Sequence, residues 1–148
     1  NWGAEKYSRV RAIERCCFSA AFVLSAAAFV VISCFPEQIA RLFVSNPTPD
    51  VLDMAVGALR LFALTYVTRW LSFAAQSCML AVEKPLPASL ISVSTALIFP
   101  VILLAALWPL GLTGVWLNFA VTALLAAVLA VVVLVRAKPQ FYRPDRTP

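Results

Sequence analysis

The chain has 148 residues, of which 62% are hydrophobic and only 13% are charged. A soluble domain of this size needs far more polar surface, so the composition excludes a soluble globular protein and predicts an all-α membrane protein with several spans. The formal net charge of +5 does not indicate nucleic-acid binding, because the basic residues lie in tails and short connections rather than on one face.

The residue types also limit the chemistry. Histidine is absent, which excludes a histidine metal site and a Ser-His triad. The four cysteines lie within or at the ends of apolar runs, where cysteine is a small buried residue rather than part of a disulfide framework. No nucleophile–base pair or metal cluster is visible in the sequence, so we expect no enzyme activity and no bound cofactor.

Residues 1–15 form a basic segment that contains Lys6, Arg9, Arg11 and Arg15. The spacing of its apolar residues predicts a helix at the membrane surface that leads into the first span. Because the chain opens on Asn1 rather than Met, we expect it to be part of a longer protein.

Residues 16–35 carry no charge and predict the first transmembrane helix. Ser19, Ala26 and Ser33 repeat every seven residues on it, a pattern that favours helix packing over substrate contact. Pro36 ends the span. The loop that follows holds a short amphipathic piece, and a turn at 46–50 leads to a new helix with Thr48 as its cap.

Residues 61–82 predict the second span and contain the most informative pattern. At 100° per residue, Thr65, Arg69, Ser72 and Gln76 fall on one stripe, with Val67 on the opposite side. A charge at bilayer depth costs about 2.5–3.5 kcal/mol, so the stripe is expected to face protein or a watery cavity. The candidate cavity residues are Arg69, Gln76, Thr65, Ser72, Tyr66 and Trp70.

Two further spans complete the prediction. The Glu83–Pro87 connection leads to a span at 88–107, which Pro100 is expected to kink. An uncharged loop at 108–114 leads to the span at 115–135, on which Asn118 and Thr122 are placed to hydrogen-bond to a neighbouring helix. The predicted transmembrane helices are therefore four: about 16–35, 61–82, 88–107 and 115–135. Residues 136–148 form a basic, proline-rich tail that is expected to be disordered.

Charge distribution predicts the orientation. Four spans put both tails and the Lys84 connection on one side, with nine Lys and Arg residues there and two, Arg41 and Arg60, on the other. The positive-inside rule then places both termini in the cytoplasm.

Two interpretations of Arg69 stay open. It lines a cavity or pairs with a buried carboxylate, or it snorkels to an interface or forms a structural ion pair. No Asp or Glu lies within the four predicted spans, so a carboxylate partner would come from outside this chain. Tyr66 and Trp70 either hold a lipophilic cation or pack in the ordinary way.

The order of short motifs resembles the MATE multidrug efflux transporters. Asn1–Val10 is similar to that family's N-Y-G-A-K-K-Y-x-R-V loop, and Phe35–Ile39 with the following Leu42-Phe43 is similar to its F-P-E-x-I…L-F loop. Ala58–Leu64 and Gly111–Leu117 match two more stretches of the family.

The resemblance implies that residues 1–148 are the C-terminal part of the second lobe of a twelve-helix, two-lobe antiporter. Such proteins lie in the plasma (inner) membrane and export drugs or organic cations in exchange for Na⁺ or H⁺. The implied partners are the bilayer, the preceding helices of the same protein and a small-molecule drug, and the coupling-ion site would lie outside this chain.

The chain departs from the family pattern in two ways. It has Val67, Arg69 and Trp70 where many relatives have a proline, an apolar residue and a small residue. It also lacks the carboxylate that some relatives have on the helix corresponding to 61–82. The alternatives are therefore a lipid-linked-sugar flippase of similar architecture, for which a cavity arginine suits an anionic head group, and a small four-helix scaffold subunit.

Overall fold

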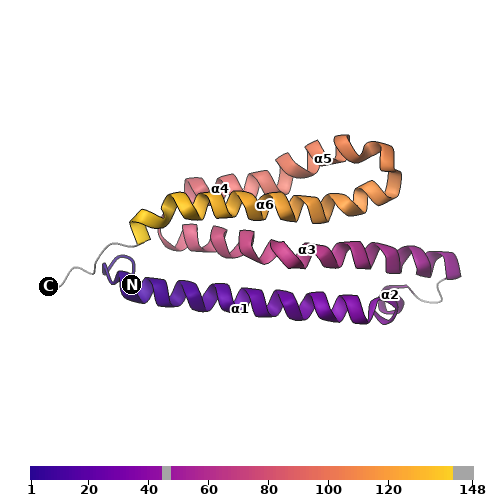
Figure 1. Ribbon diagram of the computed structural model, residues 1–148, viewed down its shortest axis with the longest axis horizontal. Coiled ribbons are helices and arrows are strands. Elements are labelled where there is room, and N and C mark those ends of the chain that lie inside the picture. The colour runs from indigo at the N-terminus through magenta and orange to yellow at the C-terminus, as the bar shows by residue number, and fades with distance from the viewer. Residues whose placement is uncertain (45–47, 142–148) are drawn as a thin grey trace.

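The computed structural model describes residues 1–44 and 48–141 and contains only helices and their connections in these ranges (Figure 1). Two long helices come first, α1 at Tyr7–Cys34 and α3 at Pro49–Ala81, with the short α2 at Pro36–Phe43 between them. A broken helix follows, made of α4 at Pro85–Val93, a π-helical turn at Ser94–Ile98 and α5 at Phe99–Leu107. A 3₁₀ turn at Trp108–Leu110 then leads into α6 at Gly111–Phe141.

Three continuous helical stretches are long and apolar enough to cross a membrane: Tyr7–Cys34, Pro49–Ala81 and Pro85–Ala137. The third has 53 residues, which would measure about 80 Å if straight, far more than the roughly 30 Å hydrocarbon core. Figure 1 shows that it folds back at the 3₁₀ turn, so it makes two crossings. The described chain is therefore a multi-pass membrane protein with the four predicted crossings.

Proline sets most of the helix starts. α2, α3 and α4 each have proline in the first turn, where its missing N–H removes no helical hydrogen bond. Thr48 occupies the N-cap position of α3 as predicted, although its side chain makes no capping hydrogen bond. α3 ends at Ala81, Glu83 then has a φ of 58°, and the Lys84 amide donates to the carbonyl of Met79 at 2.9 Å.

Pro100 breaks its helix as predicted. The π-helical turn lies directly before it, and Figure 1 shows α5 displaced from the axis of α4. A proline lacks the N–H that would bond to the preceding turn, and a π-helical turn is one way for a helix to absorb this loss.

The basic segment leads into the first span as predicted: from Tyr7 onward it is the first part of α1, because nothing between Lys6 and Cys16 interrupts helical geometry. Its place at the membrane surface stays a prediction. The prediction of a disordered tail was wrong for the first residues of that tail. The tail is helical through Phe141, since α6 continues past Arg136 and Ala137 packs into a buried cluster. The predicted turn at 46–50 lies partly, and the tail from 142 entirely, outside the described residues.

α3 is the central helix of the assembly. It packs against α1 on one side and α6 on the other, while α4 also lies against it and α5 lies against α6. The buried positions are mostly alanine, especially on α6 at Ala123, Ala126, Ala127 and Ala130. Small side chains let helix backbones approach closely in lipid, which explains the close α3–α6 packing.

Both ends of the described chain lie at the same end of the assembly (Figure 1). A buried cluster there joins Met79 and Val82 to Ala88 and Ala137, with Val10 packed against it. The segment before α1, the α3–α4 connection and the end of α6 therefore share one end, which we call the basic end because it holds Lys6, Arg9, Arg11, Arg15, Lys84 and Arg136.

Candidate functional site

The predicted polar stripe of α3 is divided between two surfaces. Thr65 and Ser72 are buried, and they precede Met79 by two heptads and one heptad on the same line of the helix. Met79 packs against Ala88 of α4 and Ala137 of α6, so this line faces the α4–α6 side. The Ser72 hydroxyl donates to the Arg69 carbonyl at 2.8 Å, whereas the Thr65 hydroxyl is buried without a partner among the described residues.

Arg69 and Gln76 lie on a more open surface. Both side chains are partly buried. Three residues on the same line of α3, Phe62, Phe73 and Leu80, are between 37% and 55% exposed, so the described helices cover this line only in part. The Phe62 ring meets Phe119 of α6 edge-on at a centroid distance of 5.8 Å. We call this line the open face of α3.

The Arg69 guanidinium is held by an aromatic ring. Its central carbon lies 5.2 Å from the centroid of the Phe73 ring, one turn further along the helix. This is cation–π distance, and it keeps the charge beside α3. Within the described part of the chain, no carboxylate forms an ion pair with Arg69.

Tyr66 and Trp70 lie toward α1 instead. The Trp70 ring meets Phe18 and Phe22 of α1 edge-on, at centroid distances of 6.4 and 5.4 Å. The Tyr66 carbonyl accepts a 2.6 Å hydrogen bond from Ser25, a buried residue of α1. The six candidate residues thus occupy three sides of α3, and only Arg69 and Gln76 share the open face.

A polar link joins α5 to α6, as predicted for Asn118 and Thr122. The Asn118 side-chain amide donates to the Pro100 carbonyl at 3.0 Å, and the Thr122 hydroxyl donates to the Asn118 side-chain oxygen at 3.0 Å. Both side chains are buried. The link fastens α6 to the broken helix at its proline.

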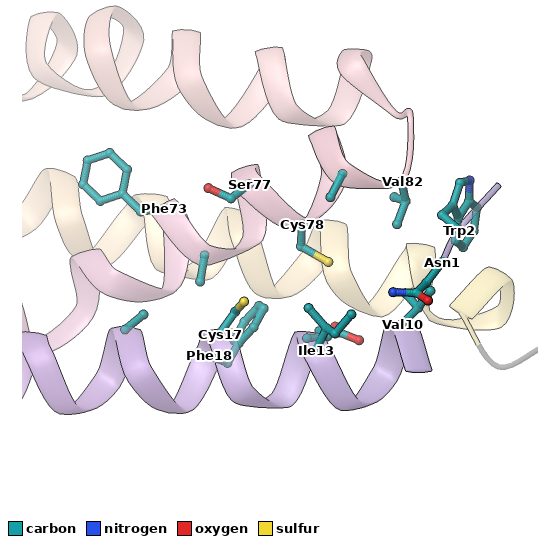
Figure 2. Close-up of a pocket in the computed structure, with 14 residues that line it drawn as sticks. Asn1, Trp2, Val10, Ile13, Cys17, Phe18, Phe73, Ser77, Cys78 and Val82 are labelled. Carbon is teal, nitrogen blue, oxygen red and sulfur yellow. The ribbon is translucent and has the colours of Figure 1, made fainter. Parts of the chain in front are cut away.

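A cleft between α1 and α3 was not predicted from the sequence. It has a volume of about 570 Å³ and lies near the basic end, as Figure 2 shows. Its walls are mainly apolar, and they include the rings of Trp2, Phe18 and Phe73. The sulfur atoms of Cys17 and Cys78 point into the gap from opposite helices (Figure 2).

Among the residues that the structure describes, Glu14 is the only charged side chain that lines this cleft. It is partly buried, and no ion pair is found for it in the ranges that the structure describes. The signal in the sequence was its spacing: Val10, Glu14, Cys17 and Ala21 lie on one face of α1, which a helical projection of residues 7–34 would have revealed.

No group of three or more His, Cys, Asp or Glu side chains that could hold a metal ion occurs among the described residues. The four cysteines are free thiols. The described residues therefore present a cation, Arg69, on a partly exposed face of α3 and an acid, Glu14, in an apolar cleft.

Comparison with known proteins identifies the family. The family model described as MatE matches residues 1–105, which include α1, α3 and the broken helix through most of α5. The chain belongs to the MATE family. This is a transporter family, so the multi-pass helices described above are those of a MATE-type transporter. Comparison with curated proteins and with solved structures gives no match.

Proposed function

We propose that this MATE chain is the C-terminal part of the second lobe of a secondary antiporter, which exports drugs or organic cations in exchange for Na⁺ or H⁺. In this proposal the protein lies in the plasma membrane, with the basic end in the cytoplasm. The coupling-ion site and the other wall of the cavity belong to preceding helices of the same protein. Transport then proceeds by alternating access between two lobes.

The observation that carries the cavity role is the position of Arg69. It lies 20 residues into the 33-residue α3, away from both helix ends, on a face that the described helices cover only in part. A charge at this depth is costly in lipid, so protein or water must face it. Gln76, two turns further on, gives the same face a second polar group. The open face is thus suited to be one wall of a translocation cavity.

The test is Arg69→Ala in the full transporter, with export measured in intact cells. We expect export to fall severalfold while membrane insertion stays normal, because the substitution removes a cavity charge and no folding contact beyond Phe73. Arg60→Ala is the matched control, since Arg60 lies on the same helix but its side chain is exposed rather than partly buried. Normal export by Arg69→Ala would refute the cavity role.

The same observation supports a second candidate, a flippase for lipid-linked sugars. An arginine without a carboxylate partner among the described residues suits an anionic head group, because its guanidinium binds phosphate in a bidentate way. Arg69-dependent transport of an anionic lipid, together with no export of cationic dyes, would establish this candidate in place of the first.

A further inference from the structure

We propose that the cleft between α1 and α3 is a binding site for lipophilic organic cations, with Glu14 as the residue that recognises the charge. The site borders the open face of α3, with which it shares Phe73, and its role as an entry site rests on the proposed function. The occupant is a bulky apolar molecule with one positive charge, such as an aromatic phosphonium or quaternary ammonium ion.

The size and lining of the cleft fit such a molecule. Its volume of about 570 Å³ lies within the roughly 300–1,000 Å³ of typical small-molecule sites. The walls are apolar on both helices, and Ala21, Ala74 and Ala81 leave room between them. A site of this kind takes its affinity from apolar contact and its selectivity from a few polar groups.

Glu14 supplies the selectivity for positive charge. It is the only charged side chain in the lining, and it has no ion-pair partner in the described chain. A carboxylate that is partly withdrawn from water gains more from a nearby cation than an exposed one does. The neighbouring Arg9 and Arg15 are exposed and do not line the cleft, so Glu14 carries the charge that the cleft lining itself presents.

Three aromatic rings support the same preference. Trp2, Phe18 and Phe73 contribute to different parts of the wall, and the face of an aromatic ring attracts a cation within about 6 Å. Figure 2 shows Trp2 at one end of the cleft and Phe73 at the other.

Phe73 connects this site to the open face of α3. Its ring lines the cleft and also lies 5.2 Å from the guanidinium carbon of Arg69. The positive charge of Arg69 therefore repels a cation at the Phe73 end of the cleft, which favours a position of the bound cation toward Glu14. In the proposed orientation the cleft lies toward the cytoplasmic side, where a lipophilic cation partitions before export.

The test uses the chain's own thiols as reporters. The protein is prepared in lipid nanodiscs with Cys16→Ser, and the rate of N-ethylmaleimide labelling is measured at each remaining cysteine. Cys17 lines the cleft, whereas Cys34 is exposed at the other end of the same helix. We expect saturating tetraphenylphosphonium to slow labelling of Cys17 about tenfold and to leave Cys34 unchanged.

The matched probe is tetraphenylborate, which has nearly the same shape and the opposite charge. We expect it to give little protection at Cys17. Equal protection by the two ions would overturn the proposal, because the cleft would then be a general apolar groove of the kind that lipid chains fill. The proposal would also be overturned if tetraphenylphosphonium slowed the labelling of Cys34 as much as the labelling of Cys17.

Two pairs of variants test the named residues. Glu14→Gln should raise the half-protecting concentration of tetraphenylphosphonium about tenfold, or about 1.4 kcal/mol, while Glu37→Gln on α2 should not change it. Ser77→Trp should fill the cleft and abolish the effect, whereas Leu80→Trp, on the same helix but outside the lining, should preserve it. Unchanged protection in Glu14→Gln would refute the role of that carboxylate.

The binding test and the function test fail separately. Cation export without protection at Cys17 would remove the cleft site and leave the proposed function standing. Protection at Cys17 in a protein that exports no cation would establish the site and remove the function.

Discussion

Gly114 occupies the tightest contact that any glycine makes in the described chain. It is buried at the start of α6, where an added Cβ would overlap the Leu107 carbonyl oxygen at the end of α5. The atom in the way belongs to the backbone, so it cannot move aside as the end of a flexible side chain could. The return from α5 into α6 therefore requires glycine at this position.

We expect Gly114→Ala to destabilise the protein by about 1–3 kcal/mol, the usual range for overpacking. Thermal unfolding in detergent would show this as a lower midpoint. Gly57→Ala is the control, since nothing lies within 4 Å of its added Cβ and alanine is the better helix former by about 1 kcal/mol. A midpoint for Gly114→Ala at or above that of the unsubstituted protein would contradict the close approach.

For single residues of α3, the sequence predicts which side chains lie on the same side of the helix, but it does not predict which of them a neighbouring helix buries. Thr65, Arg69 and Ser72 lie within about 60° of one another by helical geometry. Yet the structure buries the first and third and leaves Arg69 on the open face. The packing of α6 against α3 determines which of these side chains are buried, and it depends on residues more than 50 positions away in the sequence.

At the scale of the helices, two hydrogen bonds that run from Thr122 through Asn118 to the Pro100 carbonyl join α6 to the broken helix. Asn118→Ala removes both hydrogen bonds and leaves the Thr122 hydroxyl buried without its partner. Interhelical hydrogen bonds in membranes average about 0.6 kcal/mol, so we expect a loss of about 1–2 kcal/mol in the free energy of unfolding. Chemical unfolding in mixed micelles measures it.

Thr122→Val should cost less than Asn118→Ala, because it breaks only the bond between the two side chains. The double variant should cost less than the sum of the single ones, since they share that bond. Thr113→Val, at an exposed position of α6, is the neutral control. If the losses in unfolding free energy of Asn118→Ala and Thr122→Val simply added in the double variant, the shared hydrogen bond would be contradicted.

Helix number, order and proline-determined starts could be predicted from the sequence, because they follow from local composition. Packing partners could not. The small residues of the first span predicted a packing stripe, but Ser19 and Ser33 are exposed, and the close packing is made by alanines of α6. Alanine is frequent in several of these helices, so its count does not say which helix is central. A helical projection of α1 could have shown the face that carries Glu14, but not that α3 adds the second wall of the cleft.

For the whole molecule, the proposed orientation makes a simple prediction about thiol access. Cys34 ends α1 at the far end, and Cys16 lies on the same helix nearer the basic end. We expect a membrane-impermeant maleimide to label Cys34 in intact cells and Cys16 only after the membrane is permeabilised. Labelling in the reverse order would place the basic end outside the cell.

The position of α3 between α1 and α6 has a mechanical consequence. α1 meets α3 along its length but comes close to α6 only at the basic end, where Val10 packs against the cluster that holds Ala137. The three helices α1, α3 and α6 therefore lie in a row, and α1 contacts α6 at one end only. A displacement at the other end of α1 therefore reaches α6 through α3, the helix that carries Arg69, or through the contact at the basic end.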